Sequence, residues 1–128
     1  MQKHLPTCYE TAALILHLLK IYDDEKNKNS TRFRISRRSL RRISLRARLE
    51  DTFVAELFSE LAGLGWAAFP IDDNIALVAN SSVEDWPRIG TKGREVFTGI
   101  LDDLEQGRSK KLLELIEGRS KLILVDED

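Results

Sequence analysis

The chain has 128 residues, enough for one domain with a buried core, and its 42% apolar and 32% charged content is that of a folded globular protein. No apolar run reaches the roughly 18 residues that a membrane-spanning helix needs, and the single cysteine excludes an internal disulfide and a cysteine-based zinc site. The net charge of −1 hides an asymmetry, because residues 1–49 carry a net +8 and residues 50–128 a net −9. Such a split suggests that the first half meets an anionic partner.

The first predicted element is a helix that begins after Pro6. Thr7 and Glu10 form a Thr-x-x-Glu capping box, and the apolar pattern continues to about Tyr22. The core stripe consists of Leu14, Ile15, Leu18, Leu19 and Tyr22. Because Leu16 and Ile21 extend the apolar surface further round, the helix is either central to the domain or shared with a second chain.

A short strand and a short arginine-rich helix follow a polar linker. Residues 31–36 alternate between apolar and basic side chains, which predicts a half-buried strand. Ser36 can cap a helix over residues 37–43, whose apolar side chains are Leu40 and Ile43. At 100° per residue, four arginines fall on the opposite side of this helix, so it should present four guanidinium groups outward: Arg37, Arg38, Arg41 and Arg42.

The middle of the chain predicts a longer helix and a hairpin. Ser44 can cap a helix whose apolar residues, between Leu49 and Leu61, recur at spacings of three and four, with Gly63 and Gly65 as its C-terminal stops. Residues 66–71 and 75–79 read as two strands around Asp72-Asp73-Asn74, a turn by composition.

The C-terminal part predicts a loop over residues 81–93, helices over 95–105 and 109–117, and a short strand over 122–125. We expect two domains, residues 1–94 and residues 95–128. The apolar side chains of the second would either complete the core of the first or form a dimer interface, and we expect a homodimer because symmetric dimers are the commonest oligomers.

The predicted fold class is α+β and mainly helical. The order helix, short strand, helix, helix, hairpin over residues 7–79 resembles the winged helix-turn-helix superfamily of DNA-binding proteins in element order and length. The resemblance implies that residues 37–43 form the first helix of the motif, that residues 46–64 hold the recognition helix, and that residues 66–79 form the wing. In such folds the recognition helix lies in the major groove.

The resemblance and the charge pattern together predict double-stranded DNA as the partner, in a small regulator of transcription or a DNA-maintenance factor. Arg46 and Arg48 are expected near base edges, at the start of the recognition helix, with Thr52 one turn on. The full set of expected DNA-binding residues is Arg32, Arg34, Arg37, Arg38, Arg41, Arg42, Arg46, Arg48 and Thr52. The sequence departs from the usual pattern because this helix carries outward acidic residues and the wing tip is acidic, which phosphates would repel.

Other interpretations of the basic residues stay open. The arginine run could be a solvated face, a surface paired with the acidic half of the chain, or a surface that docks on an acidic protein partner. An amphipathic segment on anionic lipid is disfavoured, because Leu40 and Ile43 are too little apolar surface for insertion. The loop with Lys92 and Arg94 lacks P-loop spacing; it is either a simple turn or a second contact to a phosphate.

No pattern of catalysis stands out. His4 and His17 are the only histidines, and no Ser, His and Asp arrangement or metal-ligand spacing accompanies them. We therefore expect a non-enzymatic protein without a metal or other cofactor. The N-terminal residues do not read as a secretory signal, so a cytoplasmic location is expected.

Overall fold

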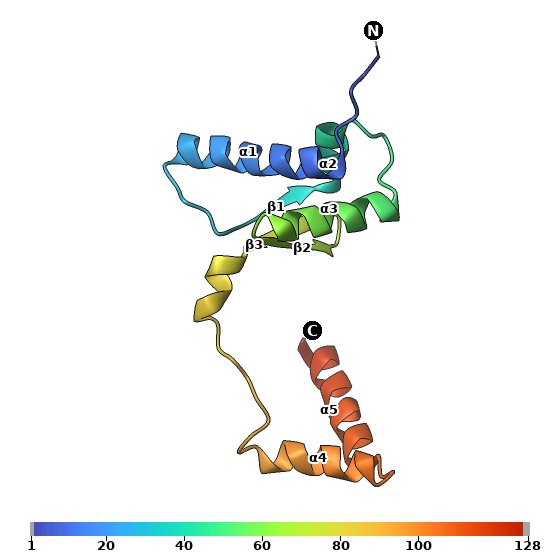
Figure 1. The fold of residues 1–128 in the computed structure, drawn as a ribbon. Coiled ribbons are helices and arrows are strands. Elements are labelled where there is room, and N and C mark those ends of the chain that lie inside the picture. The colour runs from blue at the N-terminus through green and yellow to red at the C-terminus, as the bar shows by residue number, and fades with distance from the viewer. Residues whose placement is uncertain (1, 127–128) are drawn as a thin grey trace. The chain divides into compact units, whose positions relative to one another are not determined.

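The chain divides into two compact units. The computed structural model describes residues 2–126, with side chains as far as Arg119. The first unit is Met1–Trp86 and the second is Pro87–Asp128. This division falls eight residues before the boundary predicted from the sequence. Figure 1 shows the elements of each unit in chain order.

The first unit begins with helix α1, Cys8–Lys26. The predicted capping box is present: the Glu10 backbone N–H donates to Thr7 Oγ1 at 3.1 Å, and the Thr7 N–H donates to Glu10 Oε1 at 2.9 Å. The helix runs four residues beyond the predicted end at Tyr22, because its polar last turn continues the hydrogen bonding until Asn27 takes a left-handed conformation with φ 53°.

Strand β1, Arg32–Ser36, leads directly into helix α2, Arg37–Ser44. The predicted Ser36 cap is confirmed, since the Ser39 N–H donates to Ser36 Oγ at 3.0 Å. Leu40 is fully buried, and Ile43 is half-buried against the core. The division of this short helix into an inward aliphatic side and an outward basic side therefore matches the pattern in the sequence.

Helix α3, Asp51–Gly63, begins seven residues after the predicted cap, so the prediction that Ser44 starts it is wrong. Ser44 is instead the buried last residue of α2, and its Oγ donates to Arg41 O at 3.3 Å. Leu45 ends α2 in a left-handed conformation with φ 57°. Residues 46–50 form a loop, and the N-cap residue Glu50 makes no side-chain capping hydrogen bond. Arg46 and Arg48 thus lie before the helix rather than on it.

Two further strands complete an antiparallel sheet in the order β1-β3-β2: β2, Trp66–Ile71, and β3, Asn74–Ala79. The predicted hairpin is confirmed, with Asp72 at φ 51° in its turn. The Arg37 N–H donates to Asp73 O at 3.0 Å, so the turn also holds the start of α2. Such an acidic turn at a helix N-terminus suits the helix dipole.

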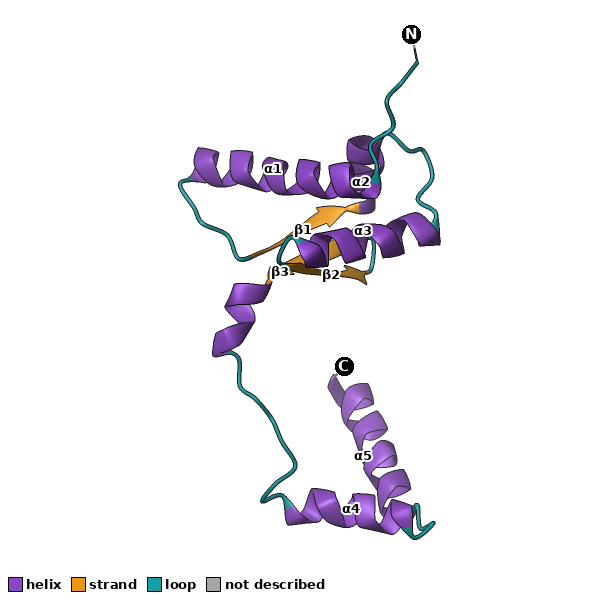
Figure 2. Cartoon of the chain, viewed as in Figure 1, coloured by secondary structure: helices purple, strands orange, loops and turns teal. Residues whose placement is uncertain are grey.

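The predicted fold class, α+β and mainly helical with a small sheet, is confirmed. The core draws on α1, α2, α3, β1 and β3 of the first unit. Figure 2 shows these helices and strands coloured by type. Its fully buried large apolar side chains are Ile15, Leu40, Leu57, Leu61, Ile75 and Leu77. Alternate residues of β3 are buried, so the helices cover one face of the sheet. A 3-10 helix, η1, Asn80–Asp85, follows β3.

The second unit contains helix α4, Glu95–Glu105, and helix α5, Lys110–Asp126. The predicted strand at residues 122–125 is wrong, because α5 continues through them; a β-prone run forms a strand only when another strand pairs with it. Asp103 holds the bend between the helices by pairing with Arg108 Nη2 at 3.1 Å and with Lys111 Nζ at 3.3 Å. No side chain described between residues 87 and 119 is buried.

The segment after α1 is anchored by Asp23. Its carboxylate accepts hydrogen bonds from Ser30 Oγ at 2.6 Å and from the Ser30 N–H at 2.9 Å. These bonds lower the pKa of Asp23 from its usual 3.8. The ionised form is therefore favoured in the folded protein, and the segment over residues 27–30 is held against the end of the helix.

We expect the variant Asp23→Asn to melt at a lower temperature than the wild type at neutral pH. Because the folded pKa of Asp23 is lowered, its stabilisation is fully present above the unfolded value of 3.8 and is lost as the pH falls below that value through the folded pKa. The two melting temperatures should therefore converge as circular-dichroism melts are taken to more acidic pH. Asp24→Asn is the matched control, since it removes a carboxylate from the same helical turn without touching Ser30. A gap that stays constant with pH would contradict this linkage.

Candidate nucleic-acid interface

The end of α2 and the loop that follows it form a basic hollow. Its volume is about 490 Å³, and it is lined by Lys3, Arg41, Arg42, Leu45, Arg46 and Ala47. Four of the six lining residues are basic and none is acidic. The structure therefore brings together three of the predicted DNA-binding arginines and adds Lys3. Lys3 was not predicted, because nothing local in the sequence places the N-terminal segment beside the distant end of α2.

Most of the predicted arginines have no anionic partner among the residues whose side chains the structure describes. Five ion pairs occur there, and only Arg48 of the predicted set takes part, with its Nε 3.5 Å from Glu50 Oε1. Both side chains of that pair are largely exposed, so the bond contributes little. The seven predicted arginines without an ion pair among the described residues are Arg32, Arg34, Arg37, Arg38, Arg41, Arg42 and Arg46. Within the described chain, the acidic half thus leaves these guanidinium groups unneutralised.

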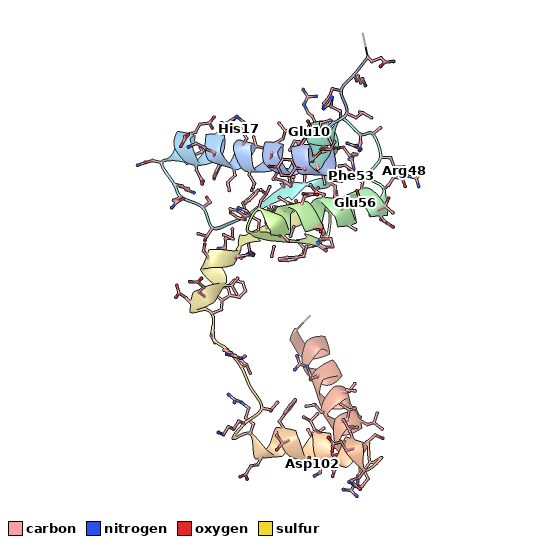
Figure 3. All side chains as sticks on the ribbon, viewed as in Figure 1. Glu10, His17, Arg48, Phe53, Glu56 and Asp102 are labelled. Carbon is pink, nitrogen blue, oxygen red and sulfur yellow. The ribbon has the colours of Figure 1, made fainter. Side chains whose placement is uncertain are left out.

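Arg46 has a structural role that the sequence analysis did not predict. Its Nη1 donates to Pro6 O at 2.7 Å and to Ser44 O at 2.9 Å. Its guanidinium carbon lies 4.1 Å from the centre of the Phe53 ring, a cation–π contact. Arg46 therefore ties the N-terminal segment and the end of α2 to α3. Figure 3 shows Phe53 on α3 and Arg48 on the preceding loop.

We expect Arg46→Met to lower the free energy of unfolding by about 2–3 kcal/mol, because hydrogen bonds to charged groups contribute about 1.5–3 kcal/mol. Arg42→Met is the matched control: Arg42 is exposed at the same helix end, and its loss should cost no more than about 0.5 kcal/mol. Urea denaturation of both variants measures the difference. Equal stabilities would show that the Arg46 contacts contribute nothing.

The outer surface of α3 is not basic. Thr52 lies in the first turn of α3 and is exposed. The acidic residues Asp51, Glu56 and Glu60 are exposed along the same helix. The turn at Asp72 and Asp73 is acidic and exposed as well. If α3 lay in a major groove, these carboxylates would lie close to the DNA phosphates and repel them. The repulsion that the sequence indicated is therefore expected from the structure as well.

The remaining predicted residues lie elsewhere. Arg32 and Arg34 are on β1, where they alternate with Phe33 and Ile35 of the core side. Their side chains therefore leave the sheet on the face opposite the core. Lys92 and Arg94 belong to the second unit, and Arg94 Nη1 donates to Gly90 O at 3.0 Å, which closes the turn.

Other polar groups form no catalytic arrangement that we recognise among the described residues. Burial raises the pKa of the Cys8 thiol, as does its hydrogen bond to Glu56 Oε2 at 3.5 Å, so the reactive thiolate is disfavoured. Hydrogen bonding by the Thr7 N–H, and then by His4, lowers the pKa of Glu10. No group of three or more His, Cys, Asp and Glu side chains in the described chain is placed to hold a metal ion.

Within the described residues, no helix has the length and apolarity needed to cross a bilayer. Comparison of the chain with protein-family models, with curated proteins and with solved structures returned no match.

Proposed function

We propose that this protein binds double-stranded DNA through the phosphate backbone, using a basic surface made by Lys3, Arg38, Arg41, Arg42 and Arg46. The observation that carries the proposal is the hollow at the end of α2, which four basic side chains line without a carboxylate. Arginine forks suit phosphate oxygens, and an external polyanion would relieve the repulsion among arginines spaced three and four apart on α2.

The arrangement of elements supports the same proposal. The elements follow one another in the order helix, strand, helix, helix and hairpin, which is typical of a winged helix-turn-helix. Strand β1 lies at the edge of the sheet and pairs with the central strand β3. If the chain is such a module, α2 and the loop to α3 would face the DNA. A small regulator of transcription or of DNA maintenance is the corresponding role.

The charges favour backbone contacts over base reading. The exposed acidic residues of α3 would be brought close to phosphates by insertion into a major groove. The α2 arginines and Lys3 carry no such penalty. We therefore expect binding that depends weakly on DNA sequence, led by contacts from α2 and the loop.

The test is a fluorescence titration of labelled duplex DNA over a range of salt concentrations. If about four to five phosphates are neutralised, the logarithm of affinity should fall with the logarithm of salt with a slope of roughly −4, because about 0.9 counterions are released per phosphate. A slope near zero would rule out a phosphate-led mode. Two duplexes of unrelated sequence should give similar slopes and affinities.

An acidic protein is the second candidate partner, and an exposed leucine in the hollow favours it. Leu45 lines the hollow, is 49% exposed and holds a left-handed backbone conformation. Phosphates gain nothing from such side chains, whereas a protein interface buries them beside its charged contacts. Both candidates use the same arginines.

The variant Leu45→Asn tests whether this exposed leucine takes part in DNA binding. Asparagine tolerates the left-handed conformation, so the backbone should keep its course. DNA affinity should stay within about twofold if phosphates are the ligand, because a leucine contributes nothing to counterion release. A large loss of DNA affinity would indicate that the leucine contacts the partner directly.

A further inference from the structure

A second groove lies between α1 and β1, and no residue of α2 lines it. Its volume is about 530 Å³, within the usual range of ligand pockets. Leu18, Leu19 and Tyr22 of α1 form one wall, and four consecutive residues of β1, from Arg32 to Ile35, form the other. Leu18 and Tyr22 are each 43% exposed, so this wall offers apolar surface that the described chain leaves partly open.

Contact with consecutive strand residues means that the groove follows the edge of β1. Alternate residues would line it if it touched only one face of the strand. β1 is an edge strand, since the sheet order is β1-β3-β2. The Ala79 N–H donates to Thr31 O at 2.8 Å, which turns the Thr31 backbone towards β3. By the alternation of an antiparallel ladder, the N–H and C=O groups of Arg32 and Arg34 point to the open edge.

The two sides of this edge differ in chemistry. On the side of α1 lie the apolar wall and the inward residues Phe33 and Ile35. On the opposite face of the sheet lie the Arg32 and Arg34 side chains, which make no ion pair with any side chain that the structure describes. An extended chain placed along the edge would therefore meet apolar surface on one face and two cations on the other.

Part of the groove lining is held by defined contacts. Lys28 and Ser30 line the groove together with α1 and β1. Lys28 Nζ lies 5.8 Å from the Tyr22 ring centre, and its backbone N–H donates to Asp23 O at 2.9 Å. The Asp23 carboxylate also holds Ser30. Such anchoring reduces the ordering that a ligand would have to impose.

From the open edge of β1 and the two chemistries beside it, we propose that the groove binds an extended peptide that adds a fourth strand next to β1. Alternate side chains of the peptide are apolar, facing Leu18 and Tyr22, and the others are acidic, facing Arg32 and Arg34. Backbone hydrogen bonds supply affinity, and side chains on alternating faces supply selectivity. A second copy of this chain is disfavoured as the occupant, because pairing two β1 edges would bring their arginines together.

The probe is a pool of synthetic heptapeptides that alternate Glu or Asp with Val, Ile, Leu or Phe, titrated into the ¹⁵N-labelled full chain. The proposal expects saturable shifts of backbone amides at residues 18–22 and 32–35, and at least tenfold slower hydrogen exchange of the Arg32 and Arg34 amides. A pool with Lys in place of the acidic residues should bind at least tenfold more weakly. Absence of saturable shifts at millimolar acidic pool, or shifts without slower exchange at those two amides, would overturn the strand-addition mode.

Two matched variants locate the binding. Arg32→Glu with Arg34→Glu should weaken the acidic pool at least tenfold and strengthen the lysine pool. Arg38→Glu with Arg42→Glu reverses the same number of charges on α2 and should leave the acidic pool within about twofold, while it weakens duplex DNA. Equal losses of peptide affinity in both pairs would mean non-specific attraction and overturn the proposal. The peptide readout does not depend on the proposed DNA function, so either can fail alone.

Discussion

Replacing Arg38, Arg41 and Arg42 together by glutamine is expected to lower the affinity for duplex DNA about 500-fold at 0.1 M salt. Each neutralised phosphate releases about 0.9 counterions, which corresponds to a factor of about eight per contact at this salt concentration. The three side chains lie on adjacent turns of α2. Arg41 and Arg42 line the hollow, and Arg38 lies on the same outward side of the helix. The salt slope of the variant should be shallower by about 2.7, and a titration at four salt concentrations measures both quantities.

The fold should survive this change. Leu40 supplies the buried contact of α2, and none of the three arginine side chains makes an ion pair with a described residue. Removing like charges at spacings of three and four should leave the melting temperature unchanged or slightly raised.

The matched control removes the same charge elsewhere, by replacing Arg88, Lys110 and Arg119 with glutamine in the second unit. Its DNA affinity should stay within about threefold of the wild type. If both triple variants lose affinity equally, overall charge rather than the α2 surface attracts DNA, and the proposed interface is wrong.

The second large effect concerns assembly through residues 87–128. No side chain described in this unit is buried, and Val96 is 87% exposed. Other large apolar side chains exposed on its helices are Phe97, Leu101, Leu104, Leu113, Leu115 and Ile116. A segment of this length without a core of its own is too small to be stable alone, and soluble monomers seldom expose so much apolar surface. We therefore expect the full chain to form a homodimer through this unit.

The double variant Phe97→Glu with Ile116→Glu should raise the dimer dissociation constant at least about 1000-fold. Burial of a large apolar side chain contributes about 1.5–3 kcal/mol, and a symmetric dimer loses each contact twice. Sedimentation equilibrium at micromolar concentration measures the change. Leu14→Glu with Leu18→Glu is the comparison on α1, whose apolar outer side is the other surface that the sequence indicated. If the α1 pair dissociates the dimer and the α4–α5 pair does not, the interface lies on α1; a wild-type monomer would contradict assembly altogether.

The sequence by itself determined the elements whose causes are local. The Thr7–Glu10 box and the Ser36 cap are short-range hydrogen bonds between residues three apart, and the structure contains both. The alternation of apolar and basic residues predicted β1, because the period of two is a property of the strand itself. The turn residues Asp72-Asp73-Asn74 between two strand-like runs predicted the hairpin. The inward position of Leu40 followed from helical spacing in the same way.

Tertiary structure decided what depends on distant partners. The sequence indicated Ser44 as the cap of the third helix. In the structure, Ser44 is the buried last residue of α2, and α3 starts only at Asp51. The sequence predicted a DNA contact for Arg46, and only the tertiary structure shows that its guanidinium also contacts Pro6, Ser44 and Phe53. Packing between residues that are far apart in the sequence places Lys3 in the basic hollow and leaves a groove between α1 and β1. Such placements follow from which surfaces the core brings together, and neither helical nor strand periodicity contains that information.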